Sequence, residues 1–109
     1  MRERVSARFV PRRSVTVAFE GGQHPTAYGV VANLSQGGAC VWTDARLDAG
    51  EHVRLSMSFA REPLPVPAEG QVVWSGPMAS SRGHRCGLRW DDTPGPDGER
   101  LRQMIAASA

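Results

Sequence analysis

Residues 14–20 read SVTVAFE, and this stretch gives the clearest indication of the fold in the whole chain. Its large apolar residues, Val15, Val17 and Phe19, alternate with smaller or polar ones. A period of two is typical of a β-strand that buries one face, because successive side chains of an extended backbone point to opposite sides. We therefore predict a half-buried strand over residues 14–20.

Five further stretches of similar length follow, separated by turn-forming clusters rich in Gly and Pro. Gly29, in the first of them, is expected to mark a bulge or a close approach of two backbones. Residues 61–69 contain three prolines and are expected to form a loop or the start of an edge strand. Six short strands at this spacing predict an antiparallel barrel or sandwich. The five stretches are residues 27–34, 39–43, 51–59, 70–76 and 84–90.

The end of the chain changes to a helical period. Leu101, Met104 and Ile105 recur at helical spacing, and Asp97 is expected to cap the helix at its start. The apolar stripe is expected to pack against the mouth of the barrel. The predicted fold class is therefore mainly β, with a short C-terminal α-helix.

Composition indicates a single soluble domain. The chain has 109 residues, of which 40% are hydrophobic and 22% charged, both ordinary values for a globular protein. No apolar run approaches the roughly 20 residues that a membrane-spanning helix needs. The basic N-terminus is not followed by an apolar segment, so we expect no secretory signal and a cytoplasmic location.

Charge is distributed unevenly along the chain. Residues 1–13 contain five arginines and one glutamate, a net charge of +4, whereas residues 14–109 contain eight arginines and ten acids, a net charge of −2. There is no lysine. A basic arm on a mildly acidic body favours an anionic partner for the arm, although a solvated basic tail would have the same composition.

Side chains that could support catalysis or bind a metal are scattered in the sequence. His24, His52 and His84 have no metal-ligand spacing and are expected to be surface residues, and Asp91 and Asp92 are expected to be solvated turn residues. No nucleophile stands near a base, and no phosphate-binding loop is present in the sequence. We therefore expect a protein that is not an enzyme and has neither a metal site nor a cofactor.

The cysteines and tryptophans are interpreted as structural residues. Cys40 and Cys86 lie in apolar strand-like stretches without a C-x-x-C motif, and are expected to be small buried residues. The tryptophans are expected to pack in the core or at the barrel ends. They are Trp42, Trp74 and Trp90.

Two stretches remain, and both suit an anionic ligand with bases. In Arg8-Phe-Val-Pro-Arg12-Arg13, arginine forks can grip phosphate or the O6/N7 edge of guanine, and their flat faces can stack on purines. In Asn33-Leu-Ser35-Gln-Gly37-Gly38, the amide and hydroxyl are hydrogen-bonding groups, and the glycines permit positive φ and close approach of a ligand. Considered alone, each stretch is also what an ordinary basic tail or turn would contain.

Together the two stretches resemble the PilZ domain family. Arg8-x-x-x-Arg12 precedes the first strand and lies 21 residues before Asn33-x-Ser35-x-x-Gly38, which follows the order and spacing of the family's RxxxR and [D/N]xSxxG motifs. The resemblance covers nearly the whole chain. It implies a six-stranded PilZ-type barrel over residues 14–109 and a flexible arm over residues 1–13.

The resemblance also implies a receptor for cyclic di-GMP, a bacterial second messenger. Arg8 and Arg12 would bind its phosphates and guanines, with Arg13 substituting for or supplementing its neighbour. Asn33 and Ser35 would be polar contacts to a base. The domain would act as an adaptor that signals to an unidentified downstream protein in motility, exopolysaccharide or biofilm control. Gly37 and Gly38 complete the implied site, with Gly38 holding the turn.

Alternatives stay open at this point. Arg4-x-x-x-Arg8 is a second register of the arm motif, and Asn33 replaces the aspartate that is commoner in the family. A PilZ domain that has lost nucleotide binding would act through protein contacts alone. An oligonucleotide-binding barrel would use the arm to hold RNA, but the acidic body makes nucleic acid the poorer fit.

Overall fold

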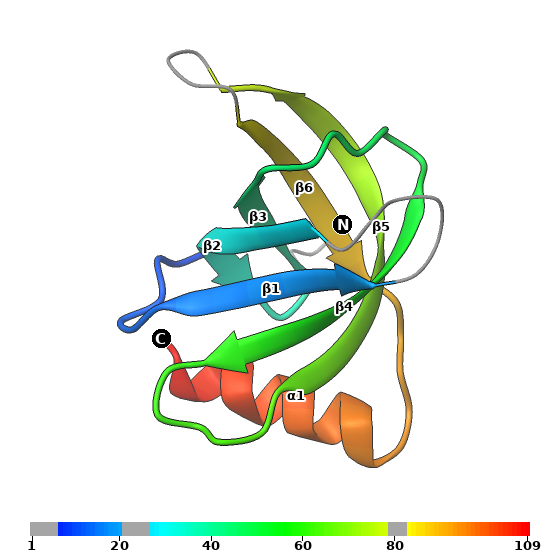
Figure 1. Cartoon of the computed structure of the whole chain (residues 1–109). Helices are drawn as coiled ribbons and strands as arrows, with labels where there is room; N and C mark the ends of the chain where they lie inside the picture. Colours follow the sequence, from blue (N-terminus) through cyan, green and yellow to red (C-terminus); the bar gives the residue numbers. More distant parts are fainter. Residues whose placement is uncertain (1–6, 21–26, 79–82) are drawn as a thin grey trace.

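The computed structural model describes residues 7–20, 27–78 and 83–109. These residues form six antiparallel strands that close into a barrel in the order β1-β2-β3-β6-β5-β4, followed by one helix (Figure 1). The predicted barrel with a C-terminal helix is confirmed. The elements are β1 (Val15–Glu20), β2 (Ala27–Ser35), β3 (Gly38–Thr43), β4 (His52–Phe59), β5 (Val66–Pro77), β6 (His84–Trp90) and α1 (Pro96–Ala107).

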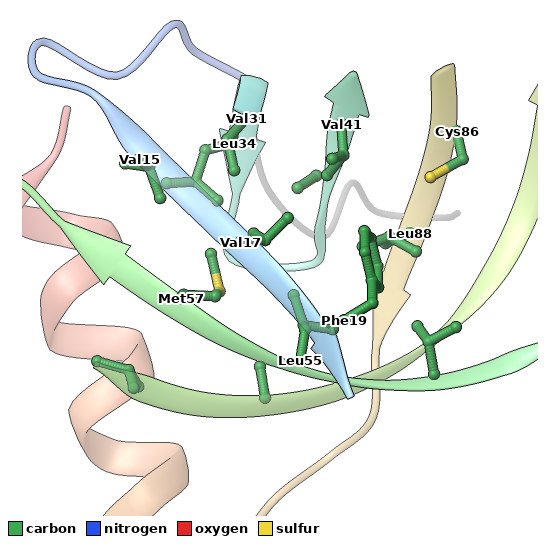
Figure 2. Close-up of a cluster of buried hydrophobic side chains, with 14 of the residues drawn as sticks. Val15, Val17, Phe19, Val31, Leu34, Val41, Leu55, Met57, Cys86 and Leu88 are labelled. Carbon is green, nitrogen blue, oxygen red and sulfur yellow. The ribbon is translucent and has the colours of Figure 1, made fainter. Parts of the chain in front are cut away.

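The core lies inside the barrel and follows the alternation of the strands (Figure 2). Val15, Val17 and Phe19 of β1 are buried, as the sequence predicts. The apolar residues of β4 face the same interior. Since burying one such side chain stabilises the fold by about 1.5–3 kcal/mol, the barrel interior is the main source of stability.

The proline-rich segment, expected to be a loop or the start of an edge strand, is irregular up to Pro65 and then starts a strand. Strand β5 begins at Val66, where Val66 and Ala68 are buried and Pro67 points outward. The first half of β5 pairs with β4, and the second half pairs with β6. Among the described residues, Val66, Pro67 and Ala68 pair with β4 alone, so the strand starts without a second partner strand, a position in which proline is tolerated.

A bulge in β2 positions the turn that follows. The register with β3 shifts between Val31 and Asn33, two residues beyond the expected position at Gly29. Gly29 instead marks a close approach, since an added Cβ would lie 2.6 Å from the Trp42 carbonyl oxygen. The shift places Asn33 opposite Cys40.

Helix α1 packs against β5 and buries Leu101 and Ile105 (Figure 1). Asp97 does not cap the helix, contrary to expectation. The N-cap is Gly95, whose φ of 90° starts the helix directly before the proline, and Asp97 lies in the first turn. A carboxylate there still interacts favourably with the helix dipole. In the described part of the chain, no helix is both long and apolar enough to cross a membrane.

Candidate functional site

The arm and the Asn33–Gly38 turn meet in the structure. Phe9 forms an isolated antiparallel bridge with Leu34, through backbone hydrogen bonds of 2.9 and 2.8 Å. This bridge places Arg8 beside Asn33, and Arg8 Nη1 donates a hydrogen bond to Asn33 Oδ1 at 3.1 Å. The two motifs that the sequence singled out are therefore in direct contact.

The Ser35 hydroxyl organises the turn from inside. Ser35 is buried, and its Oγ accepts hydrogen bonds from the backbone N–H groups of Gly37 and Gly38, both at 3.1 Å. The same hydroxyl donates to the Gly38 carbonyl oxygen at 3.3 Å. In this structure Ser35 shapes the site by fixing the backbone around it.

Gly37 and Gly38 permit positive φ, but neither adopts it in the structure. Gly38 is needed for a different reason. An added Cβ would collide with the Leu88 carbonyl oxygen on β6, a backbone atom that cannot move aside easily. Glycine at this position therefore lets β3 approach β6 closely at the start of the site.

A row of residues crosses the outer face of the barrel from this turn. Asn33 on β2 pairs with Cys40 on β3, Cys40 pairs with Gly87 on β6, and Gly87 pairs with Trp74 on β5. Cys40 and Gly87 are small, and the Trp74 ring lies so close to Gly87 that a Cβ there would collide with it. The row forms a low floor with an amide at one end and an indole ring at the other.

Trp74 and Trp42 are both largely exposed on the outside of the barrel, whereas packing in the core or at the barrel ends was expected. Their exposed fractions are 38% and 48%, whereas Trp90 is half-buried, packs against the core and donates Nε1–H to the Ser35 carbonyl oxygen at 3.3 Å. An outward indole beside a small floor offers a stacking surface for a flat ligand.

Arginines stand beside this floor. Arg85 and Arg89 flank Gly87 two residues away on either side, so the alternation of β6 turns all three outward. Arg89 Nη2 donates to the Gln71 side chain at 3.0 Å. Burial raises the pKa of the Cys40 thiol, and the guanidiniums of Arg8 and Arg85 counter part of that rise. The outer face thus combines cations with a small thiol that stays protonated.

The thiols are buried and free, as expected. Cys86 faces the core (Figure 2), and burial raises its pKa to about 11. Cys40 lies on the opposite face of the sheet. The two cysteines are structural packing residues in different environments.

A cleft of about 690 Å³ adjoins the Arg8 end of the row. This volume lies in the range of small-molecule sites. The turn, the end of β6 and the start of α1 form its walls, so residues far apart in sequence contribute to it. Its lining includes Arg8, Ser35, Gln36, Gly37, Gly38, Val73, Arg89, Trp90, Asp91, Asp92 and Arg102.

Arg12 and Arg13 lie elsewhere. They line a separate cleft of about 260 Å³ with Arg61 and the end of α1, and the Arg12 backbone N–H donates to the Ser108 carbonyl oxygen at 3.0 Å. The structure therefore brings five of the seven predicted residues together and leaves Arg12 and Arg13 apart from them. The described half of the arm is attached to the barrel at two points, and Arg4 lies outside the described residues.

Sequence reasoning missed three residues of this face. Arg85, Arg89 and Trp74 became site candidates only when the strands were placed side by side. A signal was present for the first two, because HRCGLRW alternates, with Arg85, Gly87 and Arg89 on one side and the apolar residues on the other. The position of Trp74 had no comparable signal, since it depends on a register shift in β5.

The sequence indicates no partner for the histidines, which are expected to be surface residues. His52 is exposed, as expected, but its Nε2 lies 2.6 Å from Asp91 Oδ2 and 3.7 Å from Glu69 Oε1. The hydrogen bond with Asp91 is the main cause that raises the pKa of His52. Asp91 is therefore a paired residue rather than a solvated turn residue, and His24 lies outside the described residues.

Comparison with protein families gives one match, the PilZ domain, over residues 2–107. The chain belongs to the PilZ domain family. The resemblance carried by the two motifs is thus confirmed. Members of this family are receptors and adaptors rather than enzymes. No curated protein matches the chain.

Solved structures with the PilZ fold include three similar to this chain. The inhibitor of motility MotI/DgrA from Bacillus subtilis has a TM-score of 0.70 and 20% identity, with 98% of this chain and 51% of that one covered. YcgR from Escherichia coli in complex with c-di-GMP has a TM-score of 0.74 and 14% identity, covering 95% and 45%. The isolated PilZ domain of YcgR from Escherichia coli with c-di-GMP has a TM-score of 0.68 and 12% identity, with 98% of this chain and 92% of that one covered. The chain spans about half the length of the first two, and at these identities the likeness concerns the fold.

Proposed function

We propose that this PilZ domain binds cyclic di-GMP on the outer face of β2, β3, β6 and β5, in the bacterial cytoplasm. The observation that carries the proposal is the Arg8–Asn33 hydrogen bond at the edge of the small-residue floor. This hydrogen bond holds the Arg8 guanidinium next to the Asn33 amide. A guanidinium can bind phosphate or the edge of guanine, and an amide can bind a base edge. Two structures with the same fold are described as complexes with this ligand.

Each group on this face has a role in the proposal. Arg8 binds a phosphate or the O6/N7 edge of a guanine, and Asn33 contacts the adjacent base edge. The Trp74 ring, which lies over Gly87, offers its face for a flat base to stack on, and Cys40 adds little bulk beside it. Arg85 and Arg89 add positive charge around a dianionic ligand.

Ser35 and Gly38 act mainly by shape in this proposal. The Ser35 hydroxyl already has its hydrogen bonds inside the turn, so its first contribution is to hold the backbone of Gly37 and Gly38 at the rim. Gly38 keeps β3 against β6, and the backbone around Gly37 is the part of the turn that a ligand can approach.

Arg12 joins the site only by moving. In the structure its backbone is bonded to Ser108 at the end of α1, and Arg12 and Arg13 line a different cleft from Arg8. Recruiting Arg12 to the ligand breaks this contact, which links ligand binding to the end of the helix. Ordering residues of the arm costs on the order of 1 kcal/mol each, so a ligand that contacts several groups is required. The changed surface is then presented to a downstream protein of motility, exopolysaccharide or biofilm control.

The test is a calorimetric titration of the purified chain with cyclic di-GMP, with GMP and cyclic di-AMP as control ligands. We expect cyclic di-GMP to bind and either control to bind at least about tenfold more weakly. GMP has only one of the two guanine nucleotides, and the adenines of cyclic di-AMP lack the O6/N7 edge of guanine. A chain that is folded by circular dichroism and gives no heat at millimolar cyclic di-GMP would be a PilZ domain that acts through protein contacts alone.

A further inference from the structure

Three side chains with metal-binding groups converge away from the floor of the proposed nucleotide site. His52 starts β4, Glu69 lies in β5, and Asp91 directly follows β6. One ligand atom of each lies within 4.8 Å of the others, and all three residues are exposed. The shortest separations join His52 Nε2 to Asp91 Oδ2 at 2.6 Å and to Glu69 Oε1 at 3.7 Å.

The barrel sets this arrangement through its register. Gly70 pairs with Trp90, and the Asp91 backbone N–H continues that ladder by donating to the Glu69 carbonyl oxygen at 2.9 Å. His52 pairs with Gln71, two residues beyond Glu69 and on the same face of the sheet. The three Cα positions are thus held by backbone hydrogen bonds, and only side-chain rotations remain free.

The geometry is close to what a first-row divalent cation requires. Ligand bonds of about 2.0–2.2 Å to imidazole nitrogen and carboxylate oxygen place ligand atoms roughly 3 to 3.5 Å apart around a metal. The separations between His52 and the two carboxylates bracket this range, and exposed side chains can adjust to it. One imidazole and two carboxylates also form a donor set suited to borderline cations such as Zn²⁺.

The charges of the two carboxylates also favour a divalent cation at this position. Glu69 and Asp91 bring two negative charges close together beside His52. Arg54, which pairs with Glu69 across β4 and β5, is the nearby cation that influences His52. A divalent ion would neutralise both carboxylates at once, with water completing its coordination.

We propose that His52, Glu69 and Asp91 form a binding site for a divalent cation of the Zn²⁺ class. Asp91 also lines the cleft beside Arg8 and Arg89, so the bound ion would fix one wall of that cleft. The proposal does not depend on nucleotide binding, because the barrel itself holds all three side chains close together.

The experiment is a calorimetric titration of the chelator-treated full chain with ZnCl₂, compared with Asp91→Asn and His52→Gln. We expect one Zn²⁺ per chain. Since loss of an outer-shell partner alone typically weakens metal sites by 10- to 100-fold, loss of a direct ligand should weaken binding by at least about tenfold. Co²⁺ provides a second measurement, because a His-containing site should give visible absorption that disappears in the same variants.

Matched controls are available next to the site. Asp92→Asn removes an exposed carboxylate adjacent in sequence, and His84→Gln removes a histidine from another strand; both should bind Zn²⁺ like the wild type. Circular dichroism checks that each variant is folded. Absence of Zn²⁺ binding to the wild type would overturn the proposal, as would equal affinities of Asp91→Asn and Asp92→Asn.

Discussion

The two ends of the arginine motif look equivalent in the sequence and are different in the structure. Arg8 lies on the outer face of the barrel, bonded to Asn33 and adjoining the large cleft. Arg12 lies at the end of α1, where its backbone is bonded to Ser108 and its side chain lines a smaller cleft with Arg61. Four residues along the chain separate two distinct environments.

The residue between them explains the difference. Phe9 pairs with Leu34 and packs partly against the core, so the chain is fixed to the barrel directly after Arg8. Beyond this point it continues past Pro11 toward the end of the helix. One arginine is therefore preorganised for a ligand, and the other must leave an existing contact to take part.

The largest expected effect separates these two arginines. We expect Arg8→Ala to weaken cyclic di-GMP binding by at least about 100-fold, because charge-assisted hydrogen bonds contribute about 1.5–3 kcal/mol each. Arg12→Ala should weaken it by about tenfold, since the gain from its contacts is offset by the rearrangement it requires. Calorimetry measures both affinities, with Arg100→Ala as the control, because Arg100 binds the Pro65 and Leu64 carbonyl oxygens away from this face. Equal losses in the two variants would contradict the distinction between the two ends.

The second prediction compares one serine from each region. Ser35→Ala removes the acceptor of two backbone N–H groups in a buried turn, and should lower the free energy of unfolding by about 1–3 kcal/mol. Ser108→Ala removes one hydrogen bond, to the Met104 carbonyl oxygen, and keeps the backbone carbonyl that Arg12 uses. It should cost less than about 1 kcal/mol. Urea unfolding measures both, and a larger loss for Ser108→Ala would show that the turn is not the better-anchored region.

The third prediction tests the floor beside Arg8. Gly87→Ala should displace the half-exposed Trp74 ring and weaken cyclic di-GMP binding by about tenfold, roughly the contribution of one stacking contact. Its effect on stability should be small because an exposed ring can turn aside. Gly76→Ala is the matched control, since an added Cβ there meets nothing within 4 Å. Unchanged affinity in Gly87→Ala would exclude the floor from the ligand site.

The smallest expected effect is a pH dependence of stability, which we expect near the Arg8 cleft and not near the Arg12 cleft. His52 pairs with Asp91 at the rim of the Arg8 cleft, whereas the described lining of the Arg12 cleft contains no histidine. Because the hydrogen bond with Asp91 raises the pKa of His52, protonated His52 stabilises the folded state below the unfolded pKa of about 6.5. That stabilisation is lost as the pH rises through the raised folded value.

NMR titration of the chelator-treated protein measures this directly. The His52 ring should titrate above pH 6.5, and Asp91→Asn should move its midpoint down toward the ordinary value. A His52 midpoint that is the same in the wild type and in Asp91→Asn would show that the pair is not formed in solution.

Much of the fold could be predicted because its causes are local. The alternation of Val15, Val17 and Phe19 determines which face of β1 is buried, and the same argument applies to β4. The prolines of residues 61–69 predicted a loop or the start of an edge strand, and the structure has an irregular stretch up to Pro65 and then a strand start that, among the described residues, pairs with β4 alone as far as Ala68. Asp97 was a reasonable cap by residue type, but the positive φ of Gly95 starts the helix two residues earlier.

The candidate site could be predicted only in part. Arg8, Asn33 and Ser35 were found from residue chemistry and motif spacing. Trp74 was expected to pack in the core or at a barrel end because it lies in a strand-like pattern, and the shift in β5 that turns it outward has no local signature. The pairing of His52 with Asp91 was missed for the same reason, since 39 residues separate them.

By itself, the sequence determined most of the strands and the faces they bury, the turn after the second strand and the C-terminal helix. These features depend on the period of the apolar residues and on the conformational preferences of neighbouring residues, which act over a few positions. Only the tertiary structure decided that Arg8 rather than Arg12 meets Asn33, and that Asn33, Cys40, Gly87 and Trp74 form one row. Such a row depends on the relative register of four strands, and that register is set by the closure of the whole barrel rather than by any single segment.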